Sequence, residues 1–224
     1  MVNRRRVRWQ CDCIVYGQGV PKQVDHEERR RRLAGAVFTV IGTRGLEAVS
    51  LRDVAEQAGV SMGAVQHYFP TKQAMLLFAL SHLRERVMAR LEAAVSALDR
   101  PTRRDLVRTA TAVMLPIDAP GREEACVNIA FFAAATVNPG YADQLRGGYR
   151  RILAVSVAAF HEAARLGELR AGIDPELEAP ALYFLTQGLI GPVLIGLYTP
   201  DEALAVVDGQ LDRVFRRRAA YPSR

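Results

Sequence analysis

Residues 50–72 read SLRDVAEQAGVSMGAVQHYFPTK, and this stretch predicts two short helices joined by a sharp turn. Ser50 is suited to cap the first helix, in which apolar residues recur every three or four positions and so share one buried face. Gly59 stands where the chain leaves that helix, because a residue without a Cβ adopts positive φ without strain. Ser61 is suited to cap the second helix, which ends before Pro70 since proline disfavours helix at the preceding residue. The stretch therefore has the form of a helix-turn-helix.

The second helix has a face rich in hydrogen-bonding groups. Val65 and Phe69 lie four positions apart and are expected to point inward, which leaves the other side chains on or beside the open face. A helical pair that merely packs would not need polar groups there, whereas the major groove of duplex DNA, about 12 Å wide, presents matching donors and acceptors. The residues expected at a DNA interface are Thr43, Arg44, Ser50, Ser61, Met62, Gly63, Ala64, Gln66, His67, Tyr68 and Lys72.

This part of the chain resembles the TetR-type transcriptional regulators over roughly residues 25–75. Their pattern has an alanine in the first helix, a glycine-centred turn, Ser-x-Gly, an aromatic-rich end and a lysine that opens the next helix. Ala55, the run AGVSMG, the run HYF and Lys72 match it. The chain departs from the pattern at Gln66, where the family often carries a tyrosine that contacts the DNA backbone. A glutamine can instead pair with adenine N6 and N7, which changes the role from positioning to base reading.

Length and charge indicate a DNA-binding domain joined to a larger body. The chain has 224 residues, half of them apolar, which is enough for two packed units. Residues 1–72 contain 12 Lys and Arg against 7 Asp and Glu, while the remainder contains 18 against 17. Basic charge is therefore concentrated where phosphates would be contacted. We expect a basic tail over residues 1–24, a helix-turn-helix domain over 25–72 and a ligand-binding and dimerisation domain over 73–224.

The first twenty residues carry a basic run but no apolar stretch typical of a secretory signal. They are interpreted either as a basic arm that reaches the minor groove, or as a disordered tail or misplaced start, and the second interpretation is favoured. Cys11 and Cys13 lack a second pair at metal-site spacing, and Cys126 stands alone. Three such cysteines favour a reducing, cytoplasmic location with no disulfide framework and no metal site.

The remaining sequence predicts helices throughout. Asp25 is suited to cap a helix that ends at Gly42 or Gly45, and Thr71 is suited to cap a long amphipathic helix over 72–98. Proline and glycine clusters separate the later segments. The expected body helices cover residues 102–114, 122–137, 141–166, 175–198 and 201–217. With no alternating strand pattern, the predicted fold is all-α: an N-terminal three-helix DNA-binding domain plus a C-terminal helical bundle.

The apolar run Ala181–Tyr198 has the length of a membrane span. Its polar residues, its glycines and Pro192 favour a buried helix instead, and Pro192 is expected to kink it. Gly188, Gly191 and Gly196 would allow a partner helix to approach closely. With the helix that follows, the run resembles the two-helix dimer surface of the family. The expected partners are thus a second copy of the chain and an operator in double-stranded DNA, with no membrane.

The resemblance also implies a small-molecule effector of unknown identity, held inside the body. Aromatic and polar residues suited to an apolar cavity are scattered along the body, although each alone is more often ordinary core. The candidates are Leu83, Val87, Met114, Asn128, Phe131, Phe132, Tyr149, Phe160, His161, Tyr183 and Gln187.

No catalytic motif, cofactor motif or metal-ligand spacing is present in the sequence, and its four histidines lie far apart. The expected function is therefore a ligand-responsive repressor, released from a pseudo-palindromic operator by its effector. The alternatives are an activator, a ligand-independent regulator, or an all-α enzyme with a DNA-binding head.

Overall fold

The structure, a computed structural model, describes residues 21–216, and their side chains from residue 26 onward. These residues form nine helices and no strand, so the all-α prediction is confirmed for them. The helices are α1 (Pro21–Arg44), α2 (Leu51–Ala58), α3 (Met62–Tyr68), α4 (Lys72–Ser96), α5 (Arg103–Met114), α6 (Ala119–Ala135), α7 (Pro139–Arg165), α8 (Pro175–Leu194) and α9 (Pro200–Val214).

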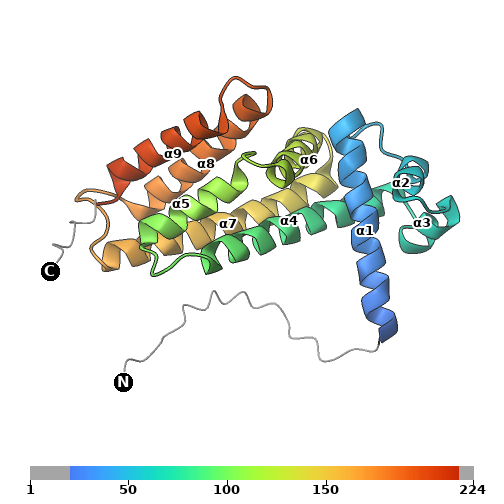
Figure 1. Cartoon of the computed structure of the whole chain (residues 1–224), viewed down its shortest axis with the longest axis horizontal. Helices are drawn as coiled ribbons and strands as arrows, with labels where there is room; N and C mark the ends of the chain where they lie inside the picture. The colour runs from blue at the N-terminus through green and yellow to red at the C-terminus, as the bar shows by residue number, and fades with distance from the viewer. Residues whose placement is uncertain (1–20, 217–224) are drawn as a thin grey trace.

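The helices are arranged as a small head and a longer body (Figure 1). We call α1, α2 and α3 the head and α5 to α9 the body. Helix α4 runs from the head along the body, and α1 crosses it and packs against α2, α4 and α6. Helices α8 and α9 pack together on the side of the body away from α4.

Side-chain caps fix the start of each helix around the turn. The hydroxyl oxygens of Ser50, Ser61 and Thr71 each accept a hydrogen bond from the backbone N–H three residues later. Gly59 has φ of +66° and directs its N–H back to the last carbonyls of α2. The three predicted caps and the glycine turn are therefore confirmed.

Several helix boundaries differ from the predictions. Helix α1 begins at Pro21, so Asp25 lies inside it and residues 21–24 belong to the helix, not to a tail. Helices α6, α7 and α9 include a proline in their first turn, where the sequence predicts a break. Proline is accepted there because the first N–H groups of a helix have no acceptor within it. The basic arm proposed for residues 1–20 lies outside the described residues.

Helices α8 and α9 end three or four residues earlier than expected. Gly196, with φ of +77°, reverses the chain just after α8, so this helix stops before Tyr198. Helix α9 stops at Val214 because Phe215 turns into an extended conformation and pairs with Leu169. The predicted end of the first helix at Gly45 is confirmed, since α1 ends at Arg44 and Gly45 has φ of +80°.

The buried apolar residues form two clusters. The first, which we call the head-side core, joins the head to the N-terminal half of α4. It continues into Val127 and Phe131 of α6 and Tyr141 of α7. The other cluster, which we call the second core, is built from α5 to α9 and their connections. Phe131 of α6 is fully buried in the head-side core. A displacement of α6 would therefore disturb the packing of the head. None of the helices within residues 21–216 is long and apolar enough to cross a membrane.

Candidate DNA-binding surface and body sites

Helix α3 separates residues that anchor it from residues that face solvent. Val65 and Phe69 are buried, as predicted from their spacing, and pack into the head-side core. Met62, Gly63, Gln66 and His67 are exposed, while Ala64 is half-buried. No described part of the chain covers this face of α3, so its side chains are accessible to a macromolecule.

Tyr68 lies at the edge of this face, half-buried. Its ring centroid is 4.7 Å from that of His26 on α1 and 5.1 Å from that of His67, and the two imidazole centroids are themselves 6.2 Å apart. The three rings form one cluster, and His26 brings α1 to the edge of the candidate interface. The sequence did not single out His26, because nothing in its local pattern marks the contact with α3.

The predicted DNA-contacting residues Thr43 and Arg44, at the end of α1, and Ser50, at the N-terminus of α2, are already hydrogen-bonded within the chain. The Arg44 guanidinium lies 2.9 Å from the Asp53 carboxylate, and the Thr43 hydroxyl donates to the Thr39 carbonyl. The Ser50 hydroxyl, which caps α2, also donates to Asp53 and, ahead of the Arg44 charge, lowers the pKa of that carboxyl. Because Arg44 is about half-exposed, its ion pair is weak and a DNA phosphate can compete with Asp53.

Lys72 lies at the first position of α4, exposed, with its ammonium 3.2 Å from the Glu47 carbonyl oxygen. This contact holds the charge beside the N-terminus of α4, where free N–H groups and the helix dipole favour an anion. The position is suited to a phosphate on the DNA backbone.

Arg30 on α1 is a residue that the sequence did not separate from its arginine neighbours. Its guanidinium lies over the rings of Phe78 and Phe69, 4.1 Å and 5.3 Å from their centroids. Since Phe69 ends α3 and Phe78 lies on α4, Arg30 ties α1 to the end of the helix that would enter the groove.

Five of the predicted ligand residues come together where α6, α7 and α8 meet, and we call them the aromatic cluster: Asn128, Phe132, Tyr149, Tyr183 and Gln187. The Tyr149 ring centroid lies 6.2 Å from the ring centroid of Phe132 and 6.1 Å from that of Tyr183. Gln187 donates to the Tyr183 hydroxyl at 3.1 Å, and Asn128 is hydrogen-bonded to Tyr149. Burial raises the pKa of both tyrosines, so both hydroxyls remain neutral at physiological pH.

The other predicted ligand residues lie elsewhere. Leu83 and Phe131 are buried in the head-side core, and Val87 packs against that core. Phe160 is buried against Phe215 in the second core. Met114 is half-buried at the end of α5.

His161 was wrongly placed in a cavity. It is exposed, and its Nε2 lies 2.8 Å from a Glu176 carboxylate oxygen. Helical spacing could not distinguish the two faces of α7, because apolar residues occur on both.

One open groove of the structure is not indicated by the sequence. It has a volume of about 360 Å³, is open to solvent, and lies between α4 and α5 beside the loop that leads into α6. Its lining residues are Arg90, Ala93, Ala94, Arg108, Thr109, Ala112, Val113, Ile117 and Asp118. Within residues 21–216 no group of three or more His, Cys, Asp or Glu side chains could hold a metal ion.

Known proteins resemble both halves of the chain. The family of bacterial regulatory proteins called tetR matches residues 36–78, and the C-terminal part of BetI-type transcriptional repressors matches residues 101–216. The HTH-type transcriptional regulator PksA of Bacillus subtilis (strain 168) is 34% identical over 171 residues, which cover 76% of this chain and 80% of PksA.

Two further comparisons extend over most of the chain. The HTH-type transcriptional regulator BetI of Brucella canis is 25% identical over 84% of this chain and 90% of its own length. The crystal structure of a transcriptional regulator from Rhodococcus sp. Rha1 superposes with a TM-score of 0.70 at 33% identity, covering 81% of this chain and 93% of that one.

Proposed function

Because the chain belongs to the TetR family of bacterial transcriptional regulators, we propose that it is a repressor which binds a pseudo-palindromic operator as a homodimer and is released by a small-molecule effector. The observation that carries this proposal is the exposed polar face of α3, set on a head whose core continues into α6 of the body. Residues 21–72 then serve as the DNA-binding domain and residues 73–224 as the domain for ligand binding and dimerisation.

In this proposal the residues of the head divide into two roles. Gln66 and His67, exposed on α3, read base edges in the major groove. Lys72, Arg44 and Tyr68 contact the sugar-phosphate backbone and so position α3. Ser50, Thr43 and Ser61 act indirectly, because their hydroxyls hold the backbone of α1, α2 and α3.

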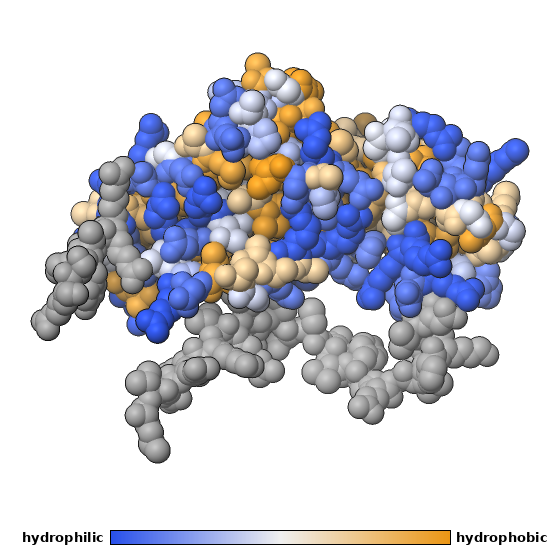
Figure 2. All heavy atoms as spheres, viewed as in Figure 1, coloured by the Kyte–Doolittle hydropathy of each residue, from blue (hydrophilic) through white to orange (hydrophobic). Residues whose placement is uncertain are grey.

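The homodimer is proposed to form through α8 and α9. Leu177 and Phe184 of α8 and Ile195, the residue that follows it, are 69%, 58% and 79% exposed in the single chain. Gly188 and Gly191 lie between Phe184 and Ile195 in the sequence, and their lack of a side chain permits close approach. Apolar residues also gather where α8 turns into α9, at the top of Figure 2. A second copy of the chain is the partner that would cover such a self-complementary face.

The effector is proposed to bind at the aromatic cluster. Apolar rings with a few amide and hydroxyl groups are the usual lining of small-molecule sites. Asn128 and Phe132 belong to α6, which packs on α1, so a ligand that moves α6 changes the support of the head. Among the helices with residues in the aromatic cluster, α6 is the one that packs extensively on α1.

The proposal is tested by selecting, from fragments of the source genome, those that the purified full-length protein retains. Footprinting of a retained fragment should show two protected half-sites related by a dyad, with centres roughly 34 to 36 Å or a little more apart. Neighbouring genes would then suggest effectors, each of which should reduce retention. Retention of all fragments alike, with no protected dyad, would contradict a role as a specific operator-binding regulator.

A further inference from the structure

We propose that the groove between α4 and α5 is a second small-molecule site, separate from the aromatic cluster, and that it binds amphipathic carboxylates. The floor of the groove is apolar, since Ala93 and Ala94 of α4 face Ala112 and Val113 of α5. Only small side chains form it, which leaves room for an unbranched alkyl chain. A groove of about 360 Å³ falls within the size range of small-ligand sites.

The charges beside the floor favour an anionic head group. Two guanidinium groups, Arg90 and Arg108, line the groove with a single carboxylate, Asp118. The Thr109 hydroxyl adds a neutral hydrogen-bonding group. Arg108 donates hydrogen bonds from its Nε and Nη2 to the Asp208 carboxylate, and this pair fixes its guanidinium beside the groove. The ligand carboxylate would pair with the Arg90 guanidinium, whereas a cationic head group would meet two like charges.

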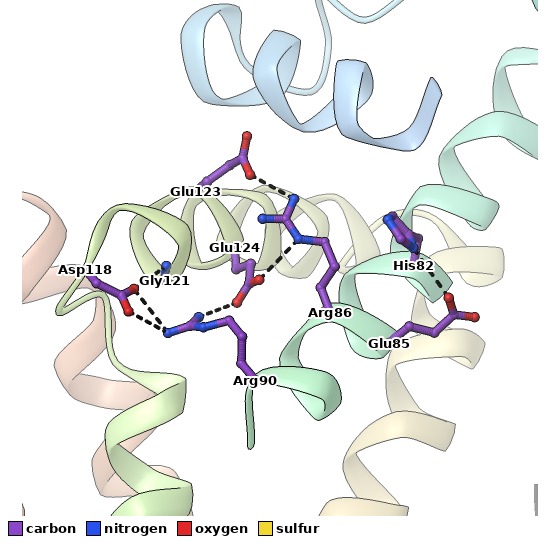
Figure 3. Close-up of polar contacts among 8 residues, drawn as sticks. All are labelled: His82, Glu85, Arg86, Arg90, Asp118, Gly121, Glu123 and Glu124. Atoms are coloured by element: carbon purple, nitrogen blue, oxygen red, sulfur yellow. Dashed lines mark hydrogen bonds and ion pairs between the residues drawn. The ribbon is translucent and has the colours of Figure 1, made fainter. Parts of the chain in front are cut away.

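Arg90 belongs to an ion-pair network that joins α4 to the start of α6 (Figure 3). Its Nη1 lies 2.5 Å from the buried carboxylate of Glu124, and its Nη2 lies 3.1 Å from Asp118. Arg86, one turn earlier on α4, contacts Glu123 at 2.9 Å and Glu124 at 3.3 Å. Of these carboxylates, that of Asp118 is the most exposed, so it is the partner that an incoming anion can replace.

A ligand carboxylate that displaces the Asp118 carboxylate from Arg90 would also affect α6, the helix that Asp118 caps. The Asp118 carboxylate accepts a hydrogen bond from the Gly121 N–H at 2.7 Å and so fixes the first turn of α6. A ligand carboxylate on Arg90 removes the contact that holds this cap in place. Occupation of the groove would therefore act on α6, because the ligand takes the place of Asp118 as an ion-pair partner of Arg90.

The same network reaches the head. The Arg86 guanidinium lies 5.2 Å from the centroid of the Phe38 ring, which is buried in α1. Arg86 therefore contacts α1 and α6 at once, and α6 itself packs on α1. We expect occupation of the groove to change operator affinity through this contact. This regulatory consequence depends on the proposed repressor function, whereas the binding site itself does not.

The binding site is tested by isothermal titration of the full-length protein with sodium octanoate, without DNA. One octanoate should bind per chain. Octan-1-ol and octyltrimethylammonium, which share its chain length, should bind at least about tenfold more weakly, because they lack the charge that pairs with Arg90. Equal binding of all three would overturn the carboxylate assignment, and so would preference for the cation.

Three variants locate the site. Arg90→Gln should weaken octanoate binding about tenfold or more. Ala93→Phe fills the groove from an exposed position on α4 without touching the ion pairs, so it should abolish binding while the melting temperature stays unchanged. Arg103→Gln is the matched control, because Arg103 also forms a part-buried ion pair, to Glu162, but lies outside the groove. Unchanged octanoate binding by Ala93→Phe would show that the ligand binds elsewhere.

The regulatory consequence is read separately from operator affinity. Octanoate should change operator affinity of the unaltered protein at least about fivefold and should have no effect on Ala93→Phe. If octanoate binds in the groove but leaves operator affinity unchanged, the coupling to α6 is refuted and the site stands. If no operator is found while octanoate still binds, the repressor function fails and the site again stands.

Discussion

At the scale of residues, α3 and the start of α4 carry two kinds of exposed side chain. Gln66 and His67 end in exposed groups on the helix itself, whereas Lys72 is held at the next helix by the Glu47 carbonyl. A side chain on α3 can reach base edges, while a charge at the N-terminus of α4 lies where the DNA backbone would pass. Substitutions in the two groups should therefore affect DNA binding differently.

The first prediction compares Gln66→Ala with Lys72→Ala. Gln66→Ala should relax sequence preference at one operator position, at a cost of about 1 to 3 kcal/mol for the preferred base. Lys72→Ala should weaken binding to all sequences alike and reduce the slope of log affinity against log salt by about one, because one phosphate contact is lost. Both are measured by titrating operator variants at several salt concentrations. Equal loss of sequence preference in the two variants would refute this division of roles.

The second prediction concerns Gly121 in the first turn of α6. A Cβ built there would lie 2.7 Å from the Asp118 carboxylate and 3.0 Å from the Leu115 carbonyl oxygen. Gly121→Ala should therefore destabilise the protein by about 1 to 3 kcal/mol, since the backbone or the cap must move. Gly147→Ala is the control, because a Cβ there meets no atom within 4 Å and should stabilise α7 by about 0.5 to 1 kcal/mol. Thermal unfolding that ranks the two variants in the opposite order would contradict the geometry of the cap.

Residue contacts were predictable from the sequence where they are local. The capping serines act on a backbone N–H three positions along, so spacing alone reveals them. The contacts of His26 with Tyr68, and of Arg30 with Phe78, join residues distant in the chain. A charged residue in a run of arginines gives no local sign that its guanidinium lies on an aromatic ring.

At the scale of elements, α8 combines a buried face with an exposed apolar face. Its buried residues, such as Leu182 and Val193, pack into the second core. The hydrophobic periodicity of the segment gives no sign of the division, because apolar residues occur on both sides of the helix. The predicted helix positions were close to the observed ones where periodicity was clear, and least accurate where a proline belongs to a first turn or a glycine ends a helix.

The third prediction tests the face of α8 that carries Gly191. A Cβ at Gly191 meets no atom of the same chain within 4 Å, so Gly191→Leu should leave the fold intact but separate two copies that pack closely there. Sedimentation velocity should show a shift from dimer to monomer. Gly147→Leu on α7, another glycine with open space, is the control and should stay dimeric. Gly196 is a poorer choice, because its φ of +77° makes any side chain strained. A fully dimeric Gly191→Leu would place the interface elsewhere.

At the scale of the whole molecule, one apolar core joins the head to α6, the helix that carries part of the proposed effector site. The head-side core includes residues of α1 and α4 together with Phe131 of α6, so a displacement of α6 would disturb the packing of the head. The sequence indicates the two functions but not this connection, because spacing along one helix does not reveal which neighbour it packs against. In the proposed repressor, the head-side core is the route by which an effector would change operator affinity.

The fourth prediction uses the spacing of the operator. Two heads fixed to one dimeric body fit two half-sites only at the matching separation and on the same side of the duplex. Inserting about half a helical turn of DNA between the half-sites should lower affinity towards that of a single half-site, since the effective-concentration gain is lost. Inserting the same length outside the operator is the control. Electrophoretic titration that shows no difference between the two insertions would indicate that the heads bind independently.

The last prediction concerns release by the effector. If an effector lowers operator affinity by some factor, saturating operator must lower the affinity for that effector by the same factor, because both describe one coupling free energy. A coupling of about 1 to 3 kcal/mol corresponds to a change of roughly 5- to 150-fold, which is well within the range of titration calorimetry. The dissociation constant of an effector should therefore be measured with free protein and with protein saturated by operator, and scrambled DNA of equal length is the control. Identical constants would mean that the ligand binds without acting as an effector, however tightly it is held.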